Sequence, residues 1–480
     1  MKHRVSRQPA VSIKRCVGAA AAACAMLLAA QPAHAFKIDP WSYRPFGVSP
    51  RGIESQLESL LYNPRMLLLG PIAMGARVPA AMGQLKEPVH ENLTELSIRC
   101  ARAPLARGTL QAGTFTASDM ILRCAGRNGD LQSHAIDLGA ANEEIIRAVR
   151  FNDAPPVKTA RALMALFTPS ALVCGEVRVP ENAGCWALLM AHAAGLAAND
   201  PGSRELGSGG NVLFRSHFGD MQYLHAMASR GETLAKGHGR ILLWARFAYQ
   251  VASGEIDTVT RIGSLPEFAG ILSGFETVTV SEFFDIRANL TPERVRRLAL
   301  GALLHTVQDS FADGHSGREL TDGQRFGPIT ALRDYTCQAS DKHDAADRAA
   351  HYAWFAAPVH GEKSPVTLGA QLIDLIARDV KWDALIGLAA PGTGTGVGTE
   401  GGSAGGTHDG TDGSTARSTP AQFMRETVFP MASANAGVVA GAGTGFLRVR
   451  ENLTATRGDA GAFNLVETAA GAEAAHDCKE

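Results

Sequence analysis

The sequence lacks features typical of membrane proteins, of nucleic-acid binders and of thiolate metal sites. After Ala30 it contains no apolar stretch long enough to cross a bilayer as a helix. It has no basic excess of the kind a dedicated nucleic-acid binder usually shows, because 46 Lys and Arg stand against 47 Asp and Glu. No C-x-x-C pair occurs, which argues against a thiolate metal site. Few segments alternate with period two, so a mainly α fold is predicted.

The first 35 residues have the pattern of a secretory signal peptide. Lys2, Arg4, Arg7, Lys14 and Arg15 form a basic head, an apolar stretch runs over 17–30, and small residues flank His34 at the expected cleavage site. We therefore expect a mature protein that begins at Phe36 and lives in a bacterial periplasm or outside the cell. Loss of the five basic residues leaves 41 basic against 47 acidic residues, a formal charge of −6.

The cysteines fit an oxidising compartment. Cys16 and Cys24 would leave with the signal peptide, and six cysteines remain for disulfide bonds: Cys100, Cys124, Cys174, Cys185, Cys337 and Cys478. Six cysteines allow fifteen pairings, and the sequence alone does not choose among them. Pairing neighbours first gives Cys100–Cys124, Cys174–Cys185 and Cys337–Cys478.

We interpret the mature chain as one helical catalytic domain over 36–390, with insertions. Glycine, threonine and serine dominate residues 391–420, so a flexible linker is predicted there. Residues 421–480 are expected to pack on the catalytic domain. Thr291, Pro292 and Glu293 read as an N-cap, a proline at the first helical position and a first-turn acid. Further helices are predicted over 240–252 and from about 340 to 354.

The segment from His305 to His315 carries the chemistry. His305 and Asp309 are four residues apart on the apolar face of the helix that begins near Thr291, so both side chains should point inward. A buried imidazole and carboxylate need a compensating partner. That partner is either a simple ion pair or a divalent cation, for which these side chains are normal zinc ligands. Gly314 is expected to end the helix and let His315 fold back to the same point.

A second pair with helical spacing, His343 and Asp347, has the same chemical character. Upstream, His217 is a candidate metal ligand. Asp220 is a candidate either for a carboxylate that contacts the metal ligands without binding the metal or for a residue of the substrate pocket. His225 is interpreted as a hydrogen-bonded core histidine.

Three upstream positions complete the candidate set. His90 precedes a predicted helix, and Asp153 lies in a turn-rich segment. Asp200 is the alternative to Asp153 as the carboxylate that bridges two metal ions. Either aspartate also suits a turn or a helix cap.

Together these residues resemble the superfamily of zinc-dependent phospholipases C and single-strand nucleases. The resemblance rests on His305-x3-Asp309-x5-His315 followed by His343-x3-Asp347, with an H-F-x-D segment at His217. It implies a helical exported phosphodiesterase with two or three Zn²⁺ ions, bound by His90, Asp153, His217, His305, Asp309, His315, His343 and Asp347. In this family the mature chain begins with a tryptophan whose amino group binds zinc. Here the amine of Phe36 is the corresponding candidate.

The resemblance implies hydrolysis of a phosphodiester by metal-activated water, with Asp153 as bridging ligand and general base. A phospholipase C-like activity on a phospholipid head group is favoured by the acidic mature charge and by the lack of a cluster of aromatic and basic residues for stacking bases. Transient contact with a membrane surface would accompany it. The alternatives are a secreted single-strand nuclease or nucleotidase, and a non-catalytic helical protein that holds zinc.

Overall fold

The computed structural model describes residues 89–102, 139–158, 176–177, single positions between 186 and 199, residues 200–287, 290–320 and 326–335, Ala346, and residues 363–385 and 418–432. Of these residues 57% are helical, which confirms the mainly α fold. The α-helices are α6 (Val89–Arg102), α9 (Ala140–Ala148), α12 (Val212–Phe218), α13 (Leu234–Ala252), α14 (Val280–Phe284), α15 (Pro292–Asp309), α18 (Pro365–Ala377) and α19 (Pro420–Phe423).

Shorter elements connect these helices. The 3-10 helices are η1 (Val149–Phe151), η2 (Arg204–Leu206), η3 (Gln222–His225), η4 (Ile262–Ser264) and η5 (Pro266–Phe268), and the π-helical segment η7 spans Met424–Val428. Strands β1 (Val157–Lys158) and β2 (Glu176–Val177) pair antiparallel, as do β3 (Ser316–Arg318) and β4 (Ile329–Leu332). Within the described part of the chain these two ribbons are too small to form a separate sheet layer.

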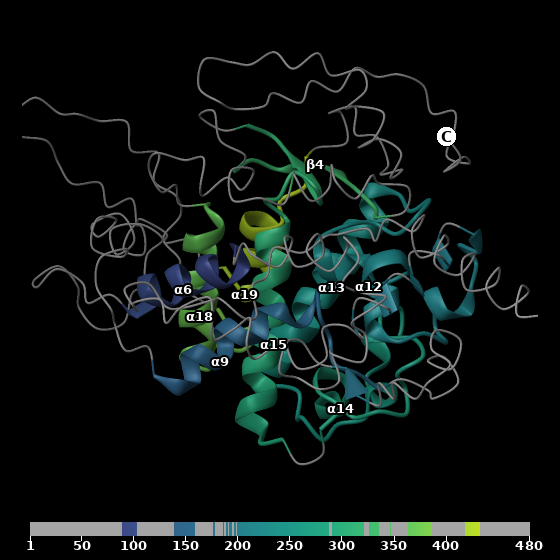
Figure 1. Ribbon diagram of the computed structural model, residues 1–480. Helices are drawn as coiled ribbons and strands as arrows, with labels where there is room; N and C mark the ends of the chain where they lie inside the picture. The colour runs from purple at the N-terminus through teal and green to yellow at the C-terminus, as the bar shows by residue number, and fades with distance from the viewer. Residues whose placement is uncertain are drawn as a thin grey trace, which may run out of the picture.

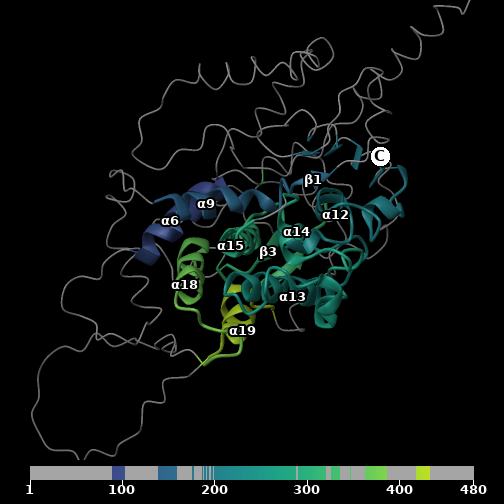
Figure 2. The same cartoon turned by 90° about the horizontal axis from the view of Figure 1, so that it is seen from below.

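Helix α15 occupies the centre of the described structure. In both views it lies between α6, α9 and α18 on one side and α12, α13 and α14 on the other (Figures 1 and 2). Its start is as predicted: the Thr291 side chain accepts a hydrogen bond from the Arg294 amide, and Pro292 takes the first helical position. Because α15 is covered on both sides, its second half is buried on every face.

The end of α15 differs from the sequence expectation. The helix stops at Asp309, five residues before Gly314. The Ser310 carbonyl accepts hydrogen bonds from Ser316 Oγ at 2.6 Å and from Arg318 Nε at 2.6 Å. These bonds occupy the carbonyl that a longer helix would need for its next turn. His315 nevertheless folds back toward Asp309, as expected.

Helix α13 begins earlier than predicted. It starts at Leu234 rather than near Arg240, because the Thr233 side chain caps the Lys236 amide. Gly237 and Gly239 are poor helix formers, so the first part of the helix is not evident in the sequence. A Cβ at Gly237 would lie 3.0 Å from Leu332 Cδ1, so this glycine also lets α13 approach β4 closely.

The segment 418–432 packs on the hairpin of β3 and β4. Thr419 caps α19, and Pro420, the last residue of the predicted linker, is its first residue. Phe423, Met424, Val428 and Phe429 are buried in the main core. The Ile329 amide donates to the Pro430 carbonyl at 2.6 Å, and the Ala432 amide donates to the Ile329 carbonyl at 3.0 Å. The helix predicted around 340–354 and the signal peptide lie outside the described residues.

Among the described helices none is both long enough and apolar enough to cross a membrane.

Candidate metal centre

Six of the predicted ligands converge in one buried cluster. His90 comes from α6, Asp153 from the turn after η1, His217 from α12, and His305, Asp309 and His315 from α15 and the turn that follows. None is more than 2% exposed. Three overlapping groups have ligand atoms close enough to hold a cation, namely His90–His305–Asp309, Asp153–His217–His225 and His225–Asp309–His315. Buried His/Asp groups that could bind a metal are therefore present.

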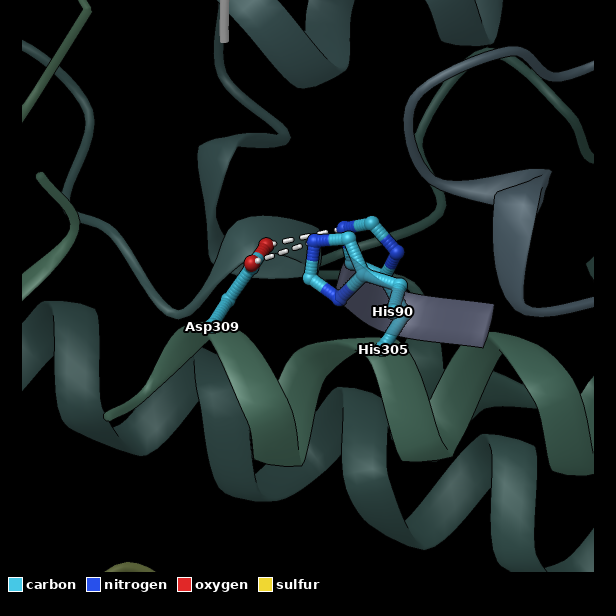
Figure 3. Close-up of side chains that lie close together, drawn as sticks. All are labelled: His90, His305 and Asp309. Atoms are coloured by element: carbon cyan, nitrogen blue, oxygen red, sulfur yellow. Dashed lines mark ion pairs between the residues drawn. The ribbon is translucent and has the colours of Figure 1, made fainter. Parts of the chain in front are cut away.

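Asp309 is surrounded by imidazole nitrogens. Its Oδ1 lies 3.2 Å from His90 Nε2, and its Oδ2 lies 2.9 Å from His305 Nε2. His225 Nδ1 at 2.9 Å and His315 Nδ1 at 3.3 Å approach the same Oδ2. Figure 3 shows the His90 and His305 rings stacked, with their ion pairs to Asp309; the ring centroids are 4.0 Å apart. The carboxylate at the end of α15 is thus the meeting point of four histidines.

A backbone carbonyl holds one nitrogen of each of four rings in the cluster; in His315 it is the same Nδ1 that approaches Asp309. Val149 O lies 2.7 Å from His305 Nδ1, and Leu213 O lies 2.7 Å from His217 Nδ1. His225 O lies 2.8 Å from His315 Nδ1, and Asn152 O lies 3.1 Å from His225 Nε2. Since a carbonyl oxygen only accepts, each of these nitrogens carries the proton. In the neutral ring the opposite nitrogen is then the one that can act as a ligand.

A side-chain relay orients His90 in the same way. Gln308 Nε2 donates to Thr94 Oγ1 at 2.8 Å, which turns Gln308 Oε1 toward His90 Nδ1, also at 2.8 Å. His90 Nδ1 therefore donates, and its Nε2 faces Asp309. A ligating histidine whose second nitrogen is held by a carbonyl or carboxamide is a recurrent feature of metal sites.

The pKa shifts in the cluster separate its histidines: His305 and His225 favour the neutral form, and His90 favours the protonated form. Burial lowers the pKa of His305 to about 3, although Asp309 opposes the shift. Burial also lowers the pKa of His225. The pKa of His90 is raised, because the charge of Asp309 and its hydrogen bond outweigh the effect of burial. Burial would raise the pKa of Asp309, but the surrounding histidines hold it well below its ordinary value. The carboxylate is ionised, and His305 and His225 resist protonation.

A divalent cation fits these donors. His305 Nε2 and His225 Nδ1 are 3.2 Å apart, and both carry lone pairs when the rings are neutral. The same two atoms face Asp309 Oδ2, which is also an acceptor. Acceptors that face one another at these distances need a positive charge between them, either a proton on one of the rings or a cation. Imidazole nitrogen and carboxylate oxygen are normal ligands of zinc and of other first-row transition metals.

Of the remaining predicted carboxylates, the structure describes Asp200 and Asp220, and neither belongs to the three candidate groups. Asp200, the rival of Asp153, is exposed in a turn, where its carbonyl accepts from the Ser203 amide at 2.9 Å. Asp220 binds the buried Arg215 guanidinium through both oxygens, at 2.7 and 2.9 Å, and belongs to none of the three candidate groups.

Other predicted positions lie outside the described residues: Phe36, His343, Asp347, Cys124, Cys174, Cys185, Cys337 and Cys478. Cys100 is disulfide-bonded, and its partner lies outside them as well.

Two members of the cluster are not evident from the sequence. His225 is buried and hydrogen-bonded, as a core histidine should be, but its partners are Asp309 and His305. The Tyr335 ring packs against three histidines, with centroid distances of 5.5 Å to His217, 5.5 Å to His225 and 5.8 Å to His315. The spacing of eight residues from His217 is the one sequence signal for His225.

Comparison with models of known protein families, with curated proteins and with solved structures finds no match to this chain.

Proposed function

We propose that this protein is an exported zinc-dependent hydrolase of phosphoric diesters, similar in activity to phospholipase C. The proposal rests above all on one observation: five histidines, each with one nitrogen held by a carbonyl or carboxamide, converge with Asp153 and Asp309 in a buried cluster. The ordered spacing of His305, Asp309 and His315, which resembles the zinc phospholipase C and nuclease superfamily, supports the same activity.

The donor set supports zinc as the ion. It combines imidazoles with carboxylates and, among the described residues of the cluster, contains no thiolate. The overlapping groups that share Asp309 and His225 support at least two ions. A divalent cation held there supplies Lewis acidity, which polarises a phosphoryl oxygen and makes water a better nucleophile.

The residues of the chain have distinct roles in this proposal. Asp309 and the histidines hold the cations, and the low pKa of His305, about 3, keeps that ring neutral as a ligand. Asp153 Oδ1 faces His305 Nε2 at 3.5 Å. Its second oxygen would accept the proton from the attacking water, so Asp153 acts as bridging ligand and general base.

The choice of substrate follows from charge. A phospholipid head group is favoured over nucleic acid because the mature chain would carry a formal charge of −6. Hydrolysis of phosphatidylcholine in mixed micelles and of single-stranded DNA should be measured side by side, each with EDTA and with added Zn²⁺. Release of phosphocholine that EDTA abolishes and Zn²⁺ restores is expected. Turnover of DNA alone would move the assignment to a nuclease.

The zinc dependence is tested with His305→Ala. This variant should lose both bound zinc and hydrolysis, while the His192→Ala variant, which changes a histidine outside the three candidate groups, should keep both. Activity of the parent protein in excess EDTA, with no bound zinc, would exclude the proposed mechanism.

A second candidate function is a structural metal site without catalysis. It is favoured by the near-complete burial of the cluster, since a structural site is closed whereas a catalytic site keeps an open position. In that case zinc should raise the thermal stability of the protein, and neither substrate should be hydrolysed.

A further inference from the structure

Arg318, on β3, is a buried cation whose hydrogen bonds within the described residues all go to neutral groups. It is 5% exposed, and its guanidinium donates to Ser310 O at 2.6 Å, Val428 O at 2.7 Å, Ser310 Oγ at 2.8 Å and Gly327 O at 3.1 Å. Its face lies over the Phe311 ring, 4.0 Å from the centroid. Burial lowers its pKa to about 9, so the guanidinium keeps its charge at neutral pH. A buried charge held by neutral dipoles depends on having its acceptors in place.

The guanidinium links three separate parts of the chain. Ser310 directly follows α15, Gly327 precedes β4, and Val428 ends the π-helical segment η7. The segment 418–432 is also held by buried apolar side chains and by its two backbone hydrogen bonds with Ile329. Through Arg318 the docked segment therefore contacts the end of α15.

Ser310 closes the turn of α15 that carries Asp309. Its amide donates to Thr306 O at 3.2 Å, while its carbonyl accepts from the Ser316 and Arg318 side chains. The last carbonyls of a helix have no partner within the helix, so such side chains replace the missing turn. Without the guanidinium, Ser310 O would keep only Ser316. We expect the last turn to fray and the backbone of Asp309 to shift.

Detachment of the segment 418–432 would act on Arg318 first. It would remove Val428 O and open the guanidinium to water. A charged group that has lost one of its buried acceptors is better stabilised in water, so the side chain would turn outward. Ser310 would then lose its contact with Arg318 as well.

From these contacts we infer that Arg318 is a positioning residue, which couples docking of the segment 418–432 to the metal affinity of the cluster. The inference rests on the proposed function only in that the cluster must hold a metal. It concerns regulation of that site by a distant segment and adds no ligand. Because coupling between two binding events is reciprocal, bound metal should favour docking by the same factor as docking favours metal binding.

The first test compares the zinc affinity of the parent protein, Arg318→Met and Arg318→Lys. Methionine keeps an apolar side chain without donors, and lysine keeps the charge but lacks the fork that reaches Ser310 and Val428 together. Arg246→Met is the matched control, because Arg246 is partly buried and also lies over a phenylalanine ring, that of Phe268 at 5.6 Å, but belongs to α13. Competition with a chelating dye measures affinity, and the visible absorption of the Co²⁺-loaded protein reports ligand geometry.

Arg318→Met should weaken zinc binding about 10-fold, at the low end of the loss typical of residues that orient a ligand, and should alter the Co²⁺ spectrum. Arg318→Lys should fall between this variant and the parent, and Arg246→Met should match the parent. Equal affinities and spectra in Arg318→Met and Arg246→Met would overturn the inference.

The second test measures docking by hydrogen exchange. The Ile329 amide donates to Pro430 O at 2.6 Å, and the Ala432 amide donates to Ile329 O at 3.0 Å, so both amides report whether the segment is docked. Added Zn²⁺ should slow their exchange up to about 10-fold in the parent and have little effect in Arg318→Met. Exchange that bound zinc leaves unchanged in the parent would reject the coupling and leave the proposed function standing.

Phe423→Leu separates coupling from a general loss of stability. Phe423 is 3% exposed in the core, so a smaller side chain there should weaken docking without touching Arg318. It should lower zinc affinity in the parent but cause no further loss in Arg318→Met. Additive losses in the double variant would reject Arg318 as the link between the segment and the cluster.

If Arg318→Met does not fold, Arg318→Lys takes its place in each comparison. A parent protein that binds no metal would refute the proposed function and the inference together. Bound zinc that slows exchange, without hydrolysis of either substrate, would refute the proposed function alone.

Discussion

At the scale of single residues, orientation of the rings matters as much as their chemical identity. Gln308 illustrates this, because its side chain connects Thr94 to His90 and is only 1% exposed. It neighbours Asp309 in sequence, and the two side chains contact opposite nitrogens of the His90 ring. Without this carboxamide, His90 Nδ1 would lose the acceptor at 2.8 Å that helps to orient the ring toward Asp309.

Gln308→Leu should therefore weaken metal binding by about 10–100-fold while keeping every ligand. Gln371→Leu is the control, because Gln371 is also a buried helical glutamine but lies on α18 rather than next to Asp309 on α15. Metal affinity by chelator competition is the measurement. Equal affinities for the two variants would show that the contact between Gln308 and His90 has no part in binding.

The direction of a side chain can be predicted from sequence in a regular helix but not in an irregular turn. Helical spacing alone puts His305 and Asp309 on one face, and the helix that carries both residues begins at the predicted position. His225 lies at the end of a short 3-10 helix, where periodicity says nothing about direction, so its place in the cluster is not predictable. Its position depends on hydrogen bonds from Asn152 and Thr306, which are distant in sequence.

At the scale of elements, the contact between α15 and the end of α9 brings the Val149 carbonyl to the His305 ring. Gly301 allows it: a Cβ at this position would lie 2.5 Å from the Ala148 carbonyl carbon and 2.7 Å from the Val149 nitrogen. Val149 O in turn holds His305 Nδ1. The glycine therefore determines how closely the backbone before Asp153 approaches α15.

Gly301→Ala should destabilise the protein by about 1–3 kcal/mol, because the added methyl group overpacks this contact. Gly239→Ala is the opposite control: apart from its chain neighbours and the backbone of its own helix, no atom of the described residues would lie within 4 Å of a Cβ added there, so the gain in helix propensity should stabilise α13 by about 0.5–1 kcal/mol. Urea unfolding measures both. Loss of stability in both variants, or in neither, would contradict this explanation.

The start of α15 is predictable from the sequence but its end is not. Thr291 and Pro292 carry local signals for a helix start. The end depends on Ser316 and Arg318, which bind the Ser310 carbonyl from the next strand. Arg318 is buried, and burial lowers its pKa to about 9. Such a tertiary contact cannot be recognised from sequence periodicity. For this reason the prediction that the helix ends at Gly314 is wrong.

At the scale of the whole molecule, His238 joins α13 to the segment 418–432 through Phe429 O. Burial lowers its pKa below the ordinary 6.5; the hydrogen bond to Phe429 O opposes the shift, and the charges of Arg318 and Arg425 add to it. The folded state thus prefers the neutral ring. As the pH falls below about 6.5, the unfolded chain takes up the proton first, so this contribution to stability is lost on acidification.

His238→Gln removes the titrating ring and keeps an amide donor for Phe429 O. We expect the free energy of unfolding to fall less steeply between pH 7 and pH 5 in this variant than in the parent, by up to about 1.4 kcal/mol per unit of pKa shift. Chemical denaturation at several pH values measures the difference. Parallel pH profiles would show that His238 takes up its proton equally in both states.

The pairing of Ile329 with Pro430 and Ala432 has a consequence for synthesis. The ribosome makes β4 about a hundred residues before the segment that lies along its edge. During that interval the edge amide and carbonyl of Ile329 are open to strands of other nascent chains, and the apolar surface that Phe423 and Phe429 later cover is bare. We therefore expect the growing polypeptide to be prone to aggregation until the segment 418–432 has been synthesised.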